Sequence, residues 1–129
     1  MKKALTLSVL ALAGLLANTA AQAQALTGDS ESGQSLFQHH CSACHSLTAN
    51  RVGPILSGVY GRKAGSVPGF SYSDAVKNSG VTWDATSIDK WLTNPRDFIP
   101  GQRMNFSISD PQKRADIIAY LKTASEAAK

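Results

Sequence analysis

Five consecutive residues carry the most specific chemistry in this sequence. Cys41-Ser42-Ala43-Cys44-His45 has the form C-x-x-C-H, the pattern at which a c-type haem is attached. Two thiols three positions apart on a helical turn can bond two vinyl-derived carbons of one porphyrin, and the next residue then holds its imidazole toward the iron. The pattern therefore predicts one haem c, bonded covalently through Cys41 and Cys44, with His45 as an axial ligand of the iron.

Three other kinds of site use cysteines at this spacing. A structural disulfide is reasonable in an oxidising compartment. A thioredoxin-like redox pair requires a βαβ setting, and no strand pattern surrounds the motif. A structural zinc site needs four ligands, and only His39 and His40 lie nearby, too close together for an ordinary site. The adjoining histidine and the absence of further cysteines favour the haem.

A haem iron bound by one histidine needs a second axial ligand, and the sequence offers few. Beyond the initiator residue, Met104 is the only methionine. A lone methionine in a loop is more often a core gap-filler, but in a haem protein it becomes the favoured sixth ligand. His39 and His40 lead directly into the motif, so they are badly placed to reach the opposite face of the haem and are expected at the surface.

The N-terminal segment predicts a secretory signal peptide over residues 1–23. Lys2 and Lys3 form a basic start, and the apolar run over residues 4–17 is shorter than the ~20 residues that a spanning helix needs. Two A-x-A patterns place the cleavage after Ala23 or Ala25. No cysteine stands at either point, so no lipid anchor is expected. Export to the periplasm agrees with the haem, because such attachment follows export.

Composition limits the remaining chain to one small domain over residues 24–129. The full chain has 129 residues, of which 43% are hydrophobic and 17% charged, which fits one domain. Removing Lys2 and Lys3 from the 13 basic residues leaves 11 against 9 acidic ones, a surplus of +2. That surplus is too weak for a nucleic-acid-binding protein. We expect a monomer without a stable membrane anchor.

Two helices should position the motif. Asp29 or Ser30 can cap the first of them. Its expected face consists of Gly33, Leu36, Phe37, His40 and Cys44. A glycine inside a helix costs about 1 kcal/mol relative to alanine, so Gly33 indicates the close approach of another element.

The last helix has the clearest signals. Asp110 is a good N-cap, and Pro111 suits the first helical position. An apolar stripe follows, made of Ile117, Ile118, Tyr120, Leu121 and Ala124. The charged residues are expected largely outside this stripe; they are Lys113, Arg114, Asp116 and Lys122.

The middle of the chain predicts loops and short turns. Residues 53–80 are rich in glycine and proline, with one brief helical turn near Asp74–Asn78. Thr86 or Ser87 can cap a short helix that ends before Pro95, and Pro100-Gly101 makes a turn. These few short helices, joined by long loops, are too little to form a good hydrophobic core in a domain of this size. We therefore expect the haem to fill the middle of the molecule.

The order of these motifs resembles class I cytochromes c, the family of mitochondrial-type and soluble bacterial c-type cytochromes. The matching segments are CSACH at 41–45, VGPIL at 52–56, GVYGRK at 58–63, PGFSY at 68–72, VTW at 81–83, NP at 94–95, IPGQRM at 99–104 and IIAYL at 117–121. They cover about residues 28–123. The resemblance implies an all-α cytochrome c fold, in which the N- and C-terminal helices cross and loops wrap a covalently bound haem.

The resemblance also implies roles for individual residues. Met104 becomes the distal iron ligand, and the Pro54 carbonyl accepts a hydrogen bond from the His45 ring. Gly33 and Phe37 are expected to meet Ile117 and Tyr120 where the helices cross. The haem propionates would be met by Arg62, Tyr72 and Trp83, and the haem pocket would include Pro54, Trp91 and Phe106. For Tyr72 and Trp83, plain core packing is the alternative.

The sequence departs from the family pattern at several positions. Family members often have asparagine, tyrosine and threonine where Val76, Trp91 and Gln102 stand. The internal hydrogen-bond network therefore does not carry over directly. Asp97 interrupts Arg96 and Arg103, which thins the family's basic ring around the haem edge.

These features predict a soluble periplasmic one-electron carrier rather than an enzyme, with no catalytic residues. A His/Met-ligated iron leaves no open position for a substrate, yet it gains and loses one electron. The expected partners are an electron donor and an electron acceptor protein. Three alternatives stay open: a haem c subunit of a periplasmic dehydrogenase complex, a haem enzyme or gas sensor with a labile distal position, and a thiol–disulfide oxidoreductase.

Overall fold

The computed structural model describes residues 26–129, so the predicted signal peptide lies outside the described residues. Within this range the chain forms five helices and no strand, apart from one isolated antiparallel bridge between Lys63 and Thr82. This confirms the predicted all-α class. None of these helices combines the length and the apolar character that crossing a membrane requires.

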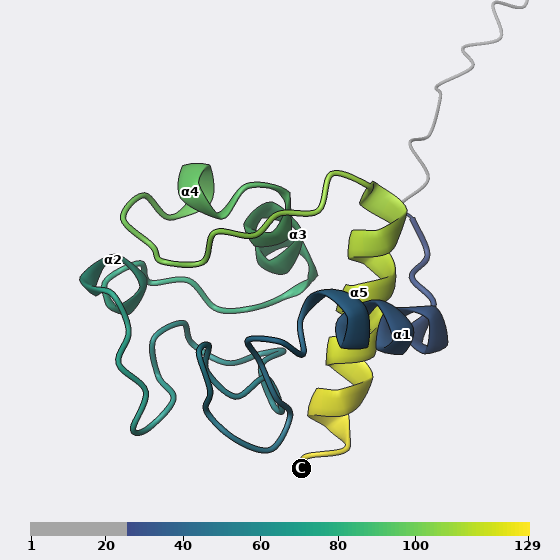
Figure 1. Cartoon of the computed structure of the whole chain (residues 1–129), viewed down its shortest axis with the longest axis horizontal. Coiled ribbons are helices and arrows are strands. Elements are labelled where there is room, and N and C mark those ends of the chain that lie inside the picture. Colours follow the sequence, from purple (N-terminus) through teal and green to yellow (C-terminus); the bar gives the residue numbers. More distant parts are fainter. Residues whose placement is uncertain (1–25) are drawn as a thin grey trace, which may run out of the picture.

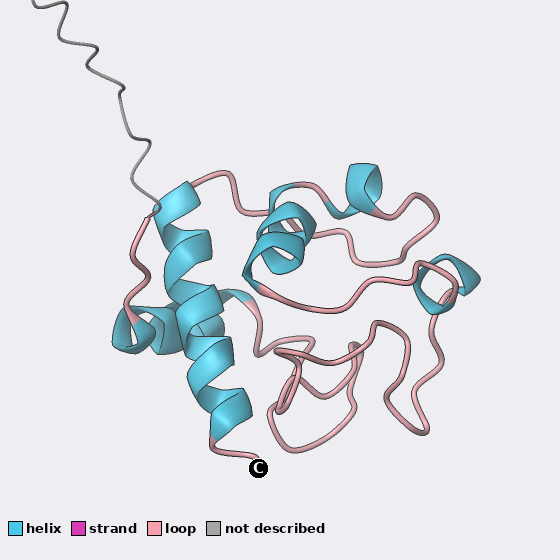
Figure 2. Cartoon of the chain, turned by 180° about the vertical axis from the view of Figure 1, so that it is seen from behind, coloured by secondary structure: helices cyan, strands magenta, loops and turns pink. Residues whose placement is uncertain are grey.

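The five helices are short except at the C-terminus (Figure 1). They are α1 (Ser30–His40), α2 (Asp74–Lys77), α3 (Ala85–Thr93), α4 (Pro95–Phe98) and α5 (Pro111–Glu126). Loops make up the whole connection between α1 and α2, as Figure 2 shows. The predicted turn near Asp74–Asn78 is α2, and the predicted turn at Pro100-Gly101 is present, with a φ of +92° at Gly101.

Helices α1 and α5 cross in close contact (Figure 1). A Cβ atom on Gly33 would lie 2.6 Å from the Asp116 carbonyl carbon and 2.8 Å from the Tyr120 Cβ. Beside this point the rings of Phe37 and Tyr120 pack with their centroids 5.4 Å apart. Ile117, which is 1% exposed, belongs to the same core cluster as Phe37. The close approach inferred from the helical glycine and the helix crossing implied by the resemblance are both confirmed.

The helix starts follow the capping rules, with one error in the prediction. Asp29 caps α1, accepting a hydrogen bond from the Ser32 amide at 2.7 Å, and this bond lowers the pKa of Asp29. Helix α3 is capped by Asp84, whereas Thr86 or Ser87 was predicted. The Asp84 carboxylate accepts from the Ser87 amide and the Ser87 hydroxyl accepts from the Asp84 amide, each at 2.8 Å. This reciprocal capping box starts the helix earlier.

Helix α4 was not predicted. It begins directly after α3, with Asn94 as its N-cap and Pro95 in the first turn. The Asn94 side chain accepts a hydrogen bond from the Asp97 amide at 3.3 Å. The prediction that α3 ends before Pro95 is therefore correct. The same proline is the first residue of α4, and its fixed φ favours that first helical position.

Helix α1 ends at His40, so Cys44 does not extend its face as predicted. Cys41 is the C-cap, and its amide donates to the Phe37 carbonyl at 2.8 Å. The next turn is still tight, because the amides of Cys44 and His45 both donate to the Cys41 carbonyl, at 3.1 and 2.8 Å. The two thiols therefore stand on one hydrogen-bonded turn.

The core consists of two clusters. The larger one joins α1, α3 and α5 through Phe37, Val59, Ile88, Leu92, Ile108, Ile117 and Leu121. The smaller one contains Ala64, Val76 and Ile99. Several large apolar side chains pack against them but are only partly buried; they include Leu47, Leu56, Tyr60, Trp83, Trp91 and Phe106.

Two charged residues of α5 are buried, contrary to the prediction that they lie outside the apolar stripe. Asp116 is 8% exposed, and its carboxylate accepts from the Asp29 amide at 2.8 Å and from the Gln112 side chain at 2.9 Å. Arg114 is 9% exposed and pairs with Asp89 of α3. Burial of a charge is tolerated where hydrogen bonds compensate it, as they do at both positions.

Candidate functional site

The His45 ring is held by the backbone of the loop that follows it. Its Nδ1 lies 2.9 Å from the Pro54 carbonyl oxygen. A carbonyl only accepts, so Nδ1 carries the proton and donates, as the resemblance predicts. Nε2 then has the free lone pair, and it makes no hydrogen bond within residues 26–129. Burial lowers the pKa of His45 against the opposing effect of the Pro54 bond, which favours the neutral ring that a metal needs.

Gly53 forms a surface against which the His45 ring packs. A Cβ atom at this position would lie 2.6 Å from both Nδ1 and Nε2 of the ring. The Gly53 amide donates to the Cys44 carbonyl at 2.8 Å, which ties this loop to the motif. The imidazole is therefore held by the hydrogen bond to the Pro54 carbonyl and by close packing against the Gly53 backbone. These contacts fit an axial haem ligand whose orientation is set by its surroundings.

Replacing Gly53 with alanine is expected to displace the His45 ring. The new methyl group has no room between loop backbone and imidazole, so we expect a loss of about 1–3 kcal/mol in the free energy of unfolding, together with a shifted visible spectrum of the haem-loaded protein. Val52→Ala is the control, because Val52 is 78% exposed next to the same site. Equal stability and spectra for both variants would contradict the tight packing at Gly53.

The Cys41 side chain is half-buried and the Cys44 side chain is exposed. Desolvation, and secondarily the neighbouring Cys44, raise the pKa of Cys41 to about 11. Thiol–disulfide oxidoreductases need a thiolate of lowered pKa, so this environment argues against that alternative. Within residues 26–129, no group of three or more His, Cys, Asp or Glu side chains is placed to hold a metal ion.

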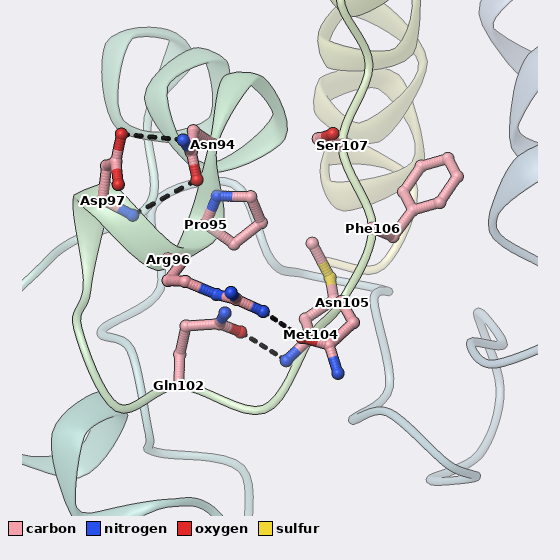
Figure 3. Close-up of a pocket in the computed structure, with 9 residues that line it drawn as sticks. All are labelled: Asn94, Pro95, Arg96, Asp97, Gln102, Met104, Asn105, Phe106 and Ser107. Carbon is pink, nitrogen blue, oxygen red and sulfur yellow. Dashed lines mark hydrogen bonds between the residues drawn. The ribbon is translucent and has the colours of Figure 1, made fainter.

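Met104 lies on the connection between α4 and α5. It is half-buried and lines a hollow of about 280 Å³ between this connection and α4. Figure 3 shows Gln102 folded back so that its side-chain oxygen accepts from the Met104 amide. Gln102, noted above for its departure from the family's threonine, thus supplies a local hydrogen bond of its own.

Phe106 brings the Met104 connection close to the C-x-x-C-H motif. Its ring centroid lies 5.9 Å from that of His40, the residue directly before Cys41. His39 and His40 are both exposed, as predicted. In Figure 3, Phe106 projects from the connection on the side away from Asn94 and Asp97. The connection that carries Met104 and the residue directly before the motif therefore lie side by side.

Arg62 lies close to both Tyr72 and Trp83. The Arg62 guanidinium donates to the Ser57 and Ile55 carbonyls at 2.9 and 2.7 Å. The backbone carbonyl of Arg62 accepts a hydrogen bond from the Trp83 amide at 2.9 Å. Burial lowers the pKa of Arg62, and burial raises the pKa of Tyr72, while each charge partly offsets the shift of the other. Within the part of the chain that the structure describes, two of the five N–H donors of this guanidinium make hydrogen bonds.

The other residues singled out from the sequence have partners within the protein. The Trp91 ring lies edge-on to that of Trp83, with centroids 5.4 Å apart. Asp97 accepts from the Asn94 side chain at 2.7 Å and pairs with neither neighbouring arginine. Arg96 donates to the Asn105 side chain, and Arg103 donates to the Ser71 carbonyl, both at 3.4 Å. Val76 is buried in the smaller core cluster.

Sequence reasoning missed two residues that shape the site. Gly53 was noted only as part of a loop, and Asn50 was not singled out. The Asn50 side chain accepts from the Ile55 amide at 2.9 Å and donates to the Pro68 carbonyl at 3.3 Å, which links the loop below His45 to a distant loop. The sequence did contain a signal for Gly53. Because the resemblance has the Pro54 carbonyl accept a hydrogen bond from His45, the glycine directly before it is expected to lie close to the His45 ring.

Comparison with known proteins agrees with this arrangement. A family model described as Cytochrome c matches residues 30–125. The chain is 50% identical over 100 residues to cytochrome c2 of Rhodomicrobium vannielii, covering 74% of this chain and 79% of that protein. It is 45% identical over 102 residues to cytochrome c of Euglena viridis, covering 77% of this chain and all of that protein.

A solved structure is also similar. Cytochrome cH from Methylobacterium extorquens superposes with a TM-score of 0.72 at 50% identity, covering 74% of this chain and 99% of that one. Proteins of this kind contain a covalently bound haem c, and Cys41 and Cys44 are the two cysteines available to bind it here. They transfer electrons to redox partners and are not enzymes. The matched residues, the crossed helices and the C-x-x-C-H turn together show that this chain belongs to the cytochrome c family.

Proposed function

We propose that this protein is a soluble periplasmic one-electron carrier, and that His45 and Met104 are the axial ligands of its haem iron. The observation that carries the proposal is the hydrogen bond from His45 Nδ1 to the Pro54 carbonyl. With the proton on Nδ1, the lone pair of Nε2 can bind the iron. When bound, the haem supplies reversible one-electron chemistry at its iron. The protein holds the group, excludes water from it and sets its potential.

The remaining residues divide into attachment, pocket and propionate roles. Cys41 and Cys44 form the two thioether bonds. Arg62 and Tyr72 are half-buried polar groups with donors to spare, and with the Trp83 indole they suit the two propionates, since a buried carboxylate requires hydrogen-bond donors. Pro54, Trp91 and Phe106 complete the pocket wall.

The proposal of a carrier follows from the occupation of both axial positions. Protein ligands on both sides leave no site at which a substrate or gas binds the iron. The half-buried side chains of Met104 and Phe106 support an electron-exchange surface at the connection between α4 and α5. Contacts there would be small, as brief docking with a donor and an acceptor requires.

The periplasmic location rests on the sequence of residues 1–23. The basic start, the apolar run and the two A-x-A patterns support export, and haem attachment at C-x-x-C-H follows export. Mass spectrometry of the mature protein tests this, because it should begin after Ala23 or Ala25 and carry one additional haem. A mature chain that still begins at Met1 would contradict it.

A reductive titration of the exported protein, followed in the visible range, tests the whole proposal. We expect a single one-electron transition, a sulfur–iron charge-transfer band in the oxidised state, and no rapid binding of carbon monoxide to the reduced protein near neutral pH. Rapid carbon monoxide binding would instead indicate a labile distal position, as in a haem enzyme or gas sensor.

The modest surface charge favours a second candidate, a haem c subunit of a periplasmic dehydrogenase complex. A permanent partner needs less electrostatic steering than a diffusing one. Near Met104, both Arg96 and Arg103 are engaged in hydrogen bonds with their own chain. Sedimentation distinguishes the two: a monomer supports the free carrier, whereas co-purification with a second polypeptide at a fixed ratio supports the subunit.

A further inference from the structure

Arg114 stands where an isolated cation is unfavourable. It lies near the start of α5, at the positive end of the helix dipole, and its side chain is only 11% exposed. Both the dipole and the loss of solvent oppose a guanidinium there. Specific contacts must therefore offset the free-energy cost of burying the Arg114 charge at this place.

Those contacts join three separate parts of the chain. Arg114 Nε donates to the Asp89 carboxylate of α3 at 2.7 Å. Arg114 Nη1 donates to the carbonyl oxygens of Ile108 and Ser109, each at 2.9 Å. The side chain thus links α5, α3 and the end of the connection that carries Met104. We call residues 102–108 the Met104 segment.

The end of the Met104 segment is fixed from two directions. The Ile108 amide donates to the Leu92 carbonyl of α3 at 2.7 Å, and its carbonyl accepts from Arg114. The Ile108 side chain is 7% exposed in the larger core cluster. At the other end, the Gln102 amide donates to the Ile99 carbonyl at 3.1 Å, and the Gln102 side chain accepts from the Met104 amide. Met104 lies between two anchored points.

We infer that Arg114 is a positioning residue for Met104, which it holds in place by fixing the end of the Met104 segment. The inference rests on the proposed ligation of iron by Met104. Three residues separate Met104 from Ile108, which is the fourth residue after Met104. Four extended residues span at most about 14 Å, so a displacement of the backbone at Ile108 can move the Met104 thioether. Anchoring this end limits the positions that the sulfur samples and favours its bond over a competing ligand.

Displacement of the methionine by imidazole in the oxidised haem-loaded protein tests the inference. The charge-transfer band reports the remaining sulfur–iron bond. Arg114→Gln removes the contacts to both carbonyls, so we expect the apparent affinity for imidazole to rise about tenfold. Asp89→Asn leaves the carbonyl contacts in place and should change it much less. Lys113→Gln is the control on the neighbouring exposed side chain and should behave as wild type.

A purely structural role for Arg114 has a different outcome. It would lower the denaturant midpoints of Arg114→Gln and Asp89→Asn alike and leave their imidazole affinities equal to that of Lys113→Gln, which would overturn the inference. If Arg114→Gln does not fold, Arg114→Lys serves instead, because an ammonium cannot span the carboxylate and both carbonyls; it should also bind imidazole more tightly than Lys113→Gln, and equal binding would overturn the inference. A wild-type protein without the band would overturn the Met104 ligation itself.

Discussion

Replacing Gly33 with alanine is expected to destabilise the protein by about 3 kcal/mol, at the upper end of the range for a methyl group forced into a packed interface. The added carbon would overlap the backbone of Asp116, 2.6 Å from its carbonyl carbon. Because that contact is with a helix backbone, α1 and α5 must separate to relieve it. Denaturant unfolding of the haem-loaded protein measures the change.

The sign of this effect is informative, because helix propensity alone predicts the opposite. Alanine favours a helix by about 1 kcal/mol over glycine, so an unpacked Gly33 would give a more stable variant. Gln34→Ala, on the exposed neighbour in α1, is the matched control and should leave stability nearly unchanged. A stabilised Gly33→Ala variant would show that the close helix crossing is absent.

Replacing Met104 with alanine should give the largest functional change. We expect the oxidised protein to lose its sulfur–iron charge-transfer band and the reduction potential to fall by roughly 0.1–0.2 V, part of the ~0.8 V range that axial ligands cover. Thioether ligation favours the reduced iron, so its loss lowers the potential. Visible spectroscopy during a redox titration records both quantities.

The matched control is Asn105→Ala. This neighbour is exposed, and its side chain only accepts the 3.4 Å hydrogen bond from Arg96. Its band and potential should stay close to those of the wild type. If Met104→Ala retained the band and the potential, Met104 would be removed from the ligand role, while the family assignment would be unaffected.

The helix ends show which features can be predicted from neighbouring residues alone. Asp110 and Pro111 were identified correctly, and Asp29 was one of the two caps considered for α1, because a cap and the amides it binds lie within a few positions of each other. Asp84 was missed for a related reason: two good capping residues follow it, and only the reciprocal bond with Ser87 decides between them. Local competition of this kind is settled by geometry that residue types do not specify.

Contacts between distant segments were the main source of error. The periodicity of α5 places Arg114 and Asp116 outside the apolar stripe, yet both are buried, since α3 and the N-terminal segment cover them. Asp116 accepts from an amide 87 positions away. A helical pattern reports which residues share a face, but not how many faces other elements cover.

The sequence alone determined the chemistry of this protein, because C-x-x-C-H brings two thiols and an imidazole together within five consecutive residues. Gly33 also indicated the close approach of another element to the first helix. Only the tertiary structure decided that Gly53 supports the His45 ring and that Arg114 anchors the Met104 segment. Those roles depend on hydrogen bonds and van der Waals contacts between elements, and such contacts exist only once the chain has folded.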